Sequence, residues 1–320
     1  MGERTFSAAT LDDVMRYAIQ ALLQDGERVN ATKGSNVELR AVRLEMTNPR
    51  ARLSRTETRG KPFSCLGELC WYLAGTNNVK FIEYYIGKYR ESDENGIVFG
   101  GYGPRLVASR AGNQIINVSN LLRAKPESRR ACIQLFDATD IADDHKDVPC
   151  TCTLQLLVRE GALHMIVYMR SNDVVWGLPH DVFCFTMFQE IIATSINVDL
   201  GTYTHIAGSL HLYDETREAA ESFIAEGLQP TTIQMPPMPA GDPWPAIATL
   251  VELEEVIRTA GPHLAGDLSG LDVYWADIVR LLQIYKCVKL KDLKTLAELR
   301  TSVANATYHP YIESKLRGKG

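Results

Sequence analysis

The stretch that decides the fold spans residues 149–181 and reads PCTCTLQLLVREGALHMIVYMRSNDVVWGLPHD. Apolar and polar residues alternate over residues 153–158 and again over residues 163–169, which is the period of β-strands. The dipeptide Glu160-Gly161 separates the two runs and favours a tight hairpin turn. We therefore expect a β-hairpin here, followed by a long apolar helix over residues 183–196 that is buried on most sides.

Upstream of this stretch the sequence predicts helices and strands in alternation. Residues 10–23 carry apolar side chains at helical spacing, with the threonine at position 10 as N-cap. Residues 37–46 and 131–136 have the pattern of strands. A second helix fits residues 64–73 and ends before Gly75. We therefore expect an α+β body.

Downstream the composition changes. Residues 229–245 contain six prolines in seventeen positions and predict an irregular connector. Residues 246–260, 272–286 and 290–304 then have the spacing of three amphipathic helices. We expect a catalytic core over residues 1–230. Residues 231–320 should form the connector and C-terminal helices, packed on the same domain.

Composition and charge limit the class of protein. The chain has 320 residues, a formal net charge of −5, 45% hydrophobic residues and 23% charged ones, which argues against disorder. A pI near 5.9 without a basic run argues against a nucleic-acid partner, and no apolar run is long enough to predict a membrane partner. The seven cysteines form no pair of CxxC motifs, so we expect no metal and a reducing, cytoplasmic location.

Cys150 is the first candidate for chemistry, because it follows a proline and precedes a predicted strand. By residue type alone, such a cysteine is more often a small buried apolar side chain. Arg170 and Ser171 close the second strand of the hairpin, and Arg129 with Arg130 lie upstream. Guanidinium and hydroxyl groups of this kind bind phosphate, and a cationic cluster also lowers the pKa of a nearby thiol.

Six short motifs occur in an order that resembles the thymidylate synthase family. They are Glu68-Leu69-Cys70-Trp71-Tyr72-Leu73-x-Gly75, Tyr102-Gly103, Ser128-Arg129-Arg130, Pro149-Cys150, Arg170-Ser171-x-Asp173 with Gly177-Leu178-Pro179, and Gly208-x-x-His211-x-Tyr213. The likeness runs from about residue 10 to residue 220, with a looser echo at Tyr308-His309-Pro310. It implies an α+β, thymidylate synthase-like fold with a mixed β-sheet packed with helices and a helical C-terminal portion.

The resemblance also implies transfer of a one-carbon unit from 5,10-methylenetetrahydrofolate to C5 of a pyrimidine nucleoside monophosphate, without a metal. Addition of the Cys150 thiolate to C6 would turn C5 into a carbanion, which divides one difficult step into two. The other implied catalytic residues are Glu68, Tyr102 and Asp173. The implied nucleotide-binding residues are Lys33, Arg129, Arg130, Arg170, Ser171, Asp181, His211 and Tyr213. The residues implied at the folate are Asp173, Gly177 and His180.

The family assembles its site from two subunits. Because the positions of Arg129 and Arg130 reach across to the other subunit in the family, the resemblance implies a homodimer with shared active sites. Lys33 lies near the place of a further phosphate-binding arginine, in a loop (residues 32–35) that fits the family only loosely.

Two departures from the family pattern concern the base and the product. Asp181 stands where thymidylate synthases carry an asparagine, and this aspartate marks the cytidylate hydroxymethylase branch. An aspartate accepts from the cytosine 4-amino group, whereas a carboxylate facing uracil O4 leaves buried groups unpaired. Residues 84–93 contain no tryptophan, where the synthases carry tryptophans beside the exocyclic methylene. Unless Tyr85 or Tyr89 fills that space, water can add to the methylene, so we expect 5-hydroxymethylation of CMP or dCMP.

Two further departures concern groups around the nucleophile and the lid. Thr151 follows the nucleophile in place of a histidine, and Ser209 replaces an acidic residue. The C-terminal residues 312–320 lack the short apolar tail that closes over folate in the synthases.

Other functions remain open from the sequence. A tolerated exchange of Asn for Asp at position 181 would leave a thymidylate synthase-like enzyme that methylates dUMP or another pyrimidine nucleotide. A catalytically inactive nucleotide-binding protein would lack the nucleophile or the phosphate-binding groups, and neither is missing. A cysteine hydrolase built on Cys150 with His205 or His211 is supported by residue type alone.

Overall fold

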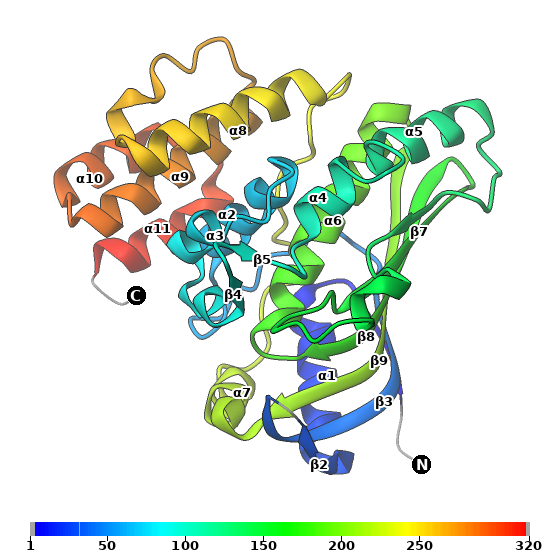
Figure 1. Cartoon of the computed structure of the whole chain (residues 1–320). Helices are drawn as coiled ribbons and strands as arrows, with labels where there is room; N and C mark the ends of the chain where they lie inside the picture. The colour runs from blue at the N-terminus through cyan, green and yellow to red at the C-terminus, as the bar shows by residue number, and fades with distance from the viewer. Residues whose placement is uncertain (1–3, 32, 318–320) are drawn as a thin grey trace.

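The computed structural model describes residues 4–31 and 33–317, with only the backbone at positions 264 and 265. Thr32 of the loop at 32–35, and the end of the C-terminal segment from Gly318 onward, lie outside the described residues. Within the described part, one large sheet and the helices around it make up the body, and a group of C-terminal helices packs beside it (Figure 1).

The large sheet is mixed, as the resemblance implied. Its strands in spatial order are β1 (Thr5–Ala8), β3 (Gly34–Met46), β9 (Asp199–Tyr213), β8 (Ala162–Asp173), β7 (Thr151–Arg159) and β6 (Cys132–Gln134), and β2 (Glu27–Ala31) also pairs with β3. The β1–β3 and β8–β9 pairs are parallel, and the other pairs are antiparallel. A second, two-stranded sheet joins β4 (Asp93–Glu94) to β5 (Ile97–Val98).

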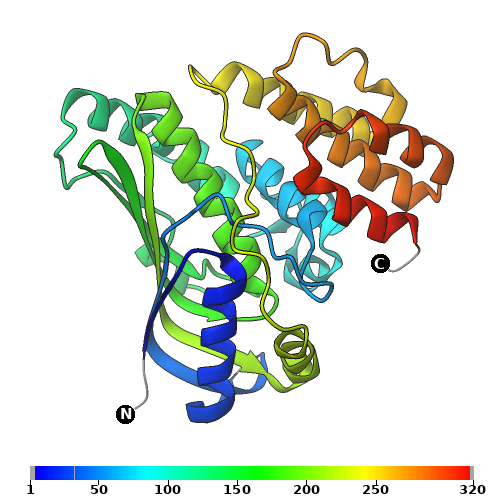
Figure 2. The same ribbon diagram turned by 180° about the vertical axis from the view of Figure 1, so that it is seen from behind.

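Helices cover one face of the large sheet. In the body they are α1 (Leu11–Asp25), α2 (Pro62–Leu73), α3 (Val79–Tyr85), α4 (Tyr102–Val107), α5 (Gln114–Ala124), α6 (Gly177–Ile196) and α7 (Arg217–Ala225). Helices α1 and α6 run along the same face (Figure 2). The other face carries partly exposed side chains, among them Tyr168, which is 43% exposed.

The elements predicted from strong local signals are confirmed. Glu160 and Gly161 adopt φ angles of 52° and 78° between β7 and β8, the left-handed conformation that a two-residue turn of this kind requires. Thr10 caps α1 by accepting a hydrogen bond from the backbone N–H of Asp13 (3.1 Å). The predicted strand at 37–46 is present as part of β3.

Several boundaries and elements differ from the prediction. Helix α2 begins at Pro62 and not at residue 64, because proline suits the first helical turn. Helix α6 begins at Gly177 and not at residue 183, because the Asp173 carboxylate accepts from backbone N–H groups of its first turn. The sequence did not predict β9, α7 or the last helix, α11 (His309–Leu316).

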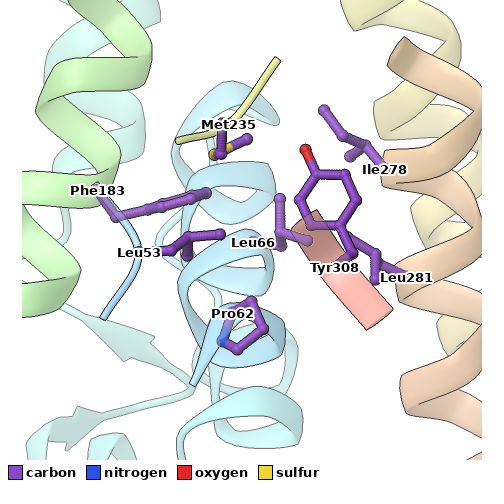
Figure 3. Close-up of a pocket in the computed structure, with 8 residues that line it drawn as sticks. All are labelled: Leu53, Pro62, Leu66, Phe183, Met235, Ile278, Leu281 and Tyr308. Carbon is purple, nitrogen blue, oxygen red and sulfur yellow. The ribbon is translucent and has the colours of Figure 1, made fainter. Parts of the chain in front are cut away.

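The proline-rich connector leads to the C-terminal helices. Residues 226–243 have neither helix nor strand. The three predicted helices follow as α8 (Trp244–Thr259), α9 (Val273–Leu290) and α10 (Leu293–Ser302). Figure 3 shows where they meet the body: Leu66 of α2 lies near Met235 of the connector and Tyr308. The division at residue 230 stays a prediction, and apolar side chains from both sides of it share this core.

A buried ion cluster anchors α6 to neighbouring loops. Glu190 is 1% exposed and accepts from Arg50 Nε (2.6 Å), from the fully buried Arg52, and from the backbone N–H of Met238 (3.1 Å). Burial favours the neutral acid, but Arg52 and Arg50 outweigh it and lower the pKa of Glu190. An ionised carboxylate therefore ties the helix to the loop before α2 and to the connector.

Candidate active site

Cys150 lies directly before β7 and is half-buried. The guanidinium of Arg170 lies 3.6 Å from its Sγ through Nη2 and is fixed by the backbone carbonyls of Val148 and Pro149, each 3.0 Å away. Burial raises the pKa of the Cys150 thiol to about 11, although Arg170 lowers it. The thiol is therefore neutral in the free protein, with a cation in place to stabilise the thiolate when it forms.

Tyr102 is joined to the residue after the nucleophile. Its hydroxyl accepts from the backbone N–H (3.1 Å) and the hydroxyl (3.0 Å) of Thr151. Its ring stacks on Tyr72 at 5.2 Å, and burial raises the pKa of Tyr102 well above its usual value. Thr151, which departs from the family's histidine, thus fixes a neutral phenol one residue from the thiol.

Glu68 lies in a wall of aromatic side chains. Its Oε1 accepts from the hydroxyls of Tyr72 (2.9 Å) and Tyr89 (2.6 Å), and the Glu68 side chain is buried. Burial, followed by the charge of Glu68, raises the pKa of both tyrosines well above the usual range, so both stay protonated. Tyr89 also packs edge-on against Trp71 at 5.3 Å. Tyr89, from the segment 84–93 that lacks tryptophan, is therefore part of this aromatic wall around Glu68.

Asp181 lies in the first turns of α6 and is held from β8. Asn172 Nδ2 donates to its Oδ2 at 2.7 Å. Burial, reinforced by the nearby Glu68 charge, raises the pKa of Asp181 well above its usual value. The side chain therefore holds a proton more readily than an ordinary aspartate, and as an acid it presents one O–H donor and one C=O acceptor. The sequence left both states open, a carboxylate that accepts from the cytosine 4-amino group and an acid that shares its proton with N3, and the raised pKa favours the acid.

The three residues predicted at the folate lie together at the start of α6. Asp173 accepts from the backbone N–H of Trp176 (2.5 Å) and of Gly177 (3.2 Å). His180 bridges the Trp176 carbonyl (3.0 Å) and the Ser64 hydroxyl (2.9 Å). A side chain at Gly177 would lie 3.0 Å from Asn172 Nδ2, so glycine leaves the Asp181 acid uncovered on that side.

Lys33 reaches the site from the loop between β2 and β3. Its Nζ pairs with Asp147 Oδ1 at 2.9 Å. Burial opposes the charge of Lys33, but Asp147 outweighs it and raises the pKa of the ammonium group. His211 and Tyr213 follow on β9 with rings 4.7 Å apart, and His211 is paired in register with Asp173. Lys33, His211 and Tyr213 thus lie at the same end of the strands as Cys150, which precedes β7.

Arg129 and Arg130, which were predicted to bind the phosphate, do not lie beside Cys150 in this chain. Arg129 and Arg130 are exposed, and the Arg129 carbonyl accepts from Gln155 Nε2 at 3.2 Å, in the middle of β7 and away from Cys150. Ser171 lies next to Arg170 on β8, opposite Ser209 of β9. Ser209 replaces an acidic residue of the family, and its hydroxyl bonds to the Glu38 carboxylate.

The site also includes groups that the sequence analysis did not assign. Asn172 and Asp147 contact Asp181 and Lys33, as described above. Arg59 is 4% exposed, and its guanidinium lies 4.9 Å from the ring of Trp176. In the part of the chain that the structure describes, Arg59 Nε and Nη2 have no partner. No local pattern marks these residues, because each is defined by a partner distant in sequence or on another element.

His205 was one candidate base of a cysteine hydrolase. It is fully buried, its Nδ1 lies 2.9 Å from the Tyr203 hydroxyl, and burial lowers its pKa to about 3. His205, enclosed in the core, cannot take a proton from the Cys150 thiol at the start of β7. Among the described residues, no group of three or more His, Cys, Asp or Glu side chains is placed to hold a metal ion, and no helix is long and apolar enough to cross a membrane.

Comparison with known proteins decides the family. The profile of the thymidylate synthase family matches residues 15–238. The chain belongs to the thymidylate synthase family. The match covers Cys150 and the elements that surround it, from α1 to the connector. The α+β fold with a mixed sheet is that of this family.

Three relatives of this chain carry the name deoxyuridylate hydroxymethyltransferase. The protein of Bacillus phage SP01 is 32% identical over 225 residues, 65% of this chain and 58% of the relative. Those of Pseudomonas phage M6 and Delftia phage PhiW-14 are each 29% identical over 203 residues, 60% and 59% of this chain and 57% and 56% of the relatives. The chain thus spans less than three fifths of the length of these relatives.

Proposed function

We propose that this protein transfers a hydroxymethyl group to C5 of a pyrimidine nucleoside monophosphate, with a cytosine nucleotide (CMP or dCMP) as substrate and 5,10-methylenetetrahydrofolate as one-carbon donor. The observation that carries the proposal is the position of Cys150 beside the Arg170 guanidinium, and the raised pKa of Asp181 supports it. Names of the phage relatives support the class of reaction.

The first step is nucleophilic addition. Cys150 attacks C6 of the ring as a thiolate, and Arg170, 3.6 Å from the sulfur, stabilises the negative charge. Arg170, Ser171 and Lys33 bind the 5′-phosphate and so orient C6 toward the sulfur. Because the thiol has a pKa of about 11 in the free protein, its proton must leave once substrate is bound. Covalent addition makes C5 nucleophilic toward the one-carbon unit.

Asp181 selects the base in this proposal. Cytosine presents an acceptor at N3 and a donor at the 4-amino group, and a neutral acid satisfies both. If the proton moves to N3, the carboxylate and the protonated ring form a charge-assisted pair. Uracil presents a donor at N3 and an acceptor at O4, which only the neutral acid satisfies. Cytosine is therefore matched whether the shared proton lies on Asp181 or on N3, whereas uracil is matched only while the proton stays on Asp181.

The hydroxymethyl product follows from the wall around the exocyclic methylene. Tyr89 of residues 84–93 fills part of this wall, which is the case in which the sequence left the product open, but its hydroxyl bonds to Glu68, so in this proposal the wall is polar where the synthases carry tryptophan. A phenol and a carboxylate hold water by hydrogen bonds, whereas an indole ring would exclude it. Water then adds to the methylene in place of hydride.

The folate site proposed here is the start of α6 and the loop before α2. The Trp176 ring is 51% exposed and offers a flat surface for an aromatic group. Arg59, with two nitrogens unpartnered among the described residues, suits a carboxylate of the folate tail. Asp173 and His180 flank the same surface.

A uracil nucleotide is the second candidate substrate. The relatives are named for deoxyuridylate, and the neutral acid of Asp181 can donate to O4 and accept from N3–H. In that case the rate should fall as pH rises and Asp181 ionises, because only the acid form binds uracil. The cytosine reaction should lose less over the same pH range.

A homodimer with shared sites is also part of the proposal. Arg129 and Arg130 are exposed and lie away from Cys150 within the chain, so they are free to reach a second subunit. Mixing an Arg129→Ala/Arg130→Ala double variant with a Cys150→Ala variant should regenerate activity from two inactive proteins. If activity stays absent after subunit exchange has been demonstrated, shared sites are excluded.

Tritium release tests the function. The 5-tritiated forms of CMP, dCMP and dUMP are incubated with and without methylenetetrahydrofolate. We expect folate-dependent release, fastest from a cytosine nucleotide, and none from Cys150→Ala, whose nucleotide affinity should stay within about tenfold of the wild type. Preference for dUMP would move the assignment to the second candidate. Release from none of the three, with nucleotide binding intact, would make this a binding protein without turnover.

A further inference from the structure

Arg59 is a buried cation in the loop before α2, and two of its nitrogens are free to bind a ligand. It is 4% exposed, and its Nε and Nη2 make no hydrogen bond within the part of the chain that the structure describes. Its guanidinium lies 4.9 Å from the ring of Trp176. Because an unpaired buried charge is costly, it is kept ready for a ligand only where the surrounding backbone is rigid. The support of this loop therefore decides whether the guanidinium is in place for an anion.

The backbone that carries Arg59 is folded around Thr56. The N–H of Arg59 donates to Thr56 Oγ1 at 3.0 Å, and the N–H of Gly60 donates to the Thr56 carbonyl at 2.8 Å. The hydroxyls of Ser54 and Thr56 lie 2.8 Å apart. We call residues 54–60 the Arg59 loop. A movement of either end of this loop is passed to Arg59 through these bonds.

Tyr311 of α11 contacts both ends of the Arg59 loop. Its hydroxyl donates to the Ser54 carbonyl at 2.8 Å. A Cβ atom at Gly60 would lie 3.0 Å from the Tyr311 ring, so the ring packs directly on the backbone at the other end. Tyr311 is 6% exposed. One buried side chain therefore holds the first and the last residue of the loop.

Two further contacts hold the middle of the Arg59 loop. The backbone N–H groups of residues 57 and 58 donate to the Glu226 carboxylate at 2.6 and 2.9 Å, which ties them to the connector. Arg55 donates to the Thr307 carbonyl at 3.0 Å. These contacts act on residues 55, 57 and 58, whereas the packing on Gly60, directly after Arg59, comes from Tyr311.

We propose that Tyr311 is a positioning residue for folate: by fixing both ends of the Arg59 loop, it holds the Arg59 guanidinium where a carboxylate of the folate tail binds. This inference rests on the proposed function, which assigns the folate tail to Arg59. Tyr311 acts through the loop, because its hydroxyl is bonded to the Ser54 carbonyl and its ring lies against Gly60. It should therefore affect the affinity for folate and leave the addition of Cys150 to the nucleotide unaltered.

A purely structural role of Tyr311 is the alternative, since α11 belongs to the C-terminal helices. Tyr308 is a matched control because it lies just before α11, is 1% exposed, and has a hydroxyl without a partner among the described residues. Tyr308→Phe and Tyr311→Phe each remove one buried hydroxyl, but Tyr311→Phe also removes a bond to the Arg59 loop. Urea titration shows that both variants are folded.

Kinetics and direct binding test the proposal. For Tyr311→Phe we expect the KM for methylenetetrahydrofolate to rise about fivefold, with kcat and the KM for the nucleotide unchanged, whereas Tyr308→Phe should match the wild type. The Kd of folic acid, followed by quenching of tryptophan fluorescence with nucleotide bound, should rise by the same factor. In an Arg59→Ala background, Tyr311→Phe should have no further effect, because the group that Tyr311 positions is gone.

An unchanged Kd for folic acid in Tyr311→Phe would overturn the inference, and so would an equal rise in Tyr308→Phe. A fall in kcat without a change in KM, or a further loss when Tyr311→Phe is added to Arg59→Ala, would also overturn it. Failure of the wild type to bind folic acid while it still binds nucleotide would instead refute the folate site of the proposed function.

Discussion

Helix α6 carries two carboxyl groups, Glu190 and Asp181, whose pKa values are shifted in opposite directions. Glu190 is enclosed by Arg50 and Arg52, which lower its pKa despite burial. Asp181 faces the candidate site, where burial and the Glu68 charge raise its pKa well above its usual value. Its hydrogen-bond partner within the helix-and-sheet body is the amide of Asn172. The same kind of group, a carboxyl on one helix and nine positions apart, thus has its pKa lowered at one place and raised at the other.

The opposite pKa shifts indicate that Glu190 stabilises the fold, whereas Asp181 is available to recognise a ligand. The Glu190 cluster satisfies its charge within the chain and binds two loops to the helix. Asp181 keeps donor and acceptor capacity that the chain does not use, beside the buried Asn172 Oδ1, which has no partner among the described residues. Buried polar atoms left unpaired are costly, so their presence beside Asp181 points to a ligand that completes them.

The largest expected effect concerns Glu190. Glu190→Gln removes the charge between two arginines, one of them fully buried, and should lower the free energy of unfolding by about 3–5 kcal/mol. Urea titration followed by circular dichroism measures it, with Glu255→Gln on the exposed side of α8 as control. Loss of less than about 1 kcal/mol would show that the cluster is not the anchor described here.

Asp181→Asn should change recognition. The amide keeps one donor and one acceptor but cannot shift a proton, so preference should move toward the uracil nucleotide by roughly 100-fold in the ratio of kcat/KM values. Competitive tritium release from dCMP and dUMP gives this ratio. Asn172→Ala should move the ratio less, because it removes only the donor that holds Asp181. An unchanged ratio in Asp181→Asn would remove Asp181 from base selection.

The pH dependence of stability should differ in sign between the two carboxyl groups. The lowered pKa of Glu190 adds stability above its ordinary value of 4.5, and this is lost as pH falls through the folded-state pKa. The raised pKa of Asp181 acts in reverse: stability is lost as pH rises from 3.8 toward the folded-state value. As pH rises toward 4.5, Glu190→Gln should therefore become more destabilising, and as pH rises above 3.8, Asp181→Asn should become more stabilising relative to wild type. Parallel trends would contradict the assigned charge states.

Sequence reasoning succeeded where the determining signal is local. The hairpin follows from Glu160-Gly161 and two alternating runs, and α1 from its capping threonine. Strand β9 was missed because Gly201 and Gly208 interrupt its pattern and both of its edges are paired, so buried and exposed positions do not alternate cleanly. The first turns of α6 were missed because the residue that accepts from the backbone N–H groups of Trp176 and Gly177 is Asp173, at the end of a strand.

For the candidate site, motif order brought Cys150, Arg170 and Asp181 into one prediction, and the structure places them around one site. Contacts between residues that are distant in sequence could not be predicted, because no motif contains both members of the pair. Lys33 and Asp147 are separated by 114 positions, and the Arg59–Trp176 contact joins a loop to a helix start. The charge state of Asp181 also follows from burial, which a residue pattern does not contain.

The central claim is that water, delivered beside Cys150, completes a one-carbon transfer to a pyrimidine nucleotide. The most direct measurement is mass spectrometry of the nucleotide product formed in ¹⁸O-labelled water from dCMP, CMP or dUMP with methylenetetrahydrofolate. We predict a 5-hydroxymethyl nucleotide that carries the ¹⁸O label, formed by the wild type and not by Cys150→Ala, without accumulation of dihydrofolate. A methylated nucleotide formed together with dihydrofolate would contradict the account.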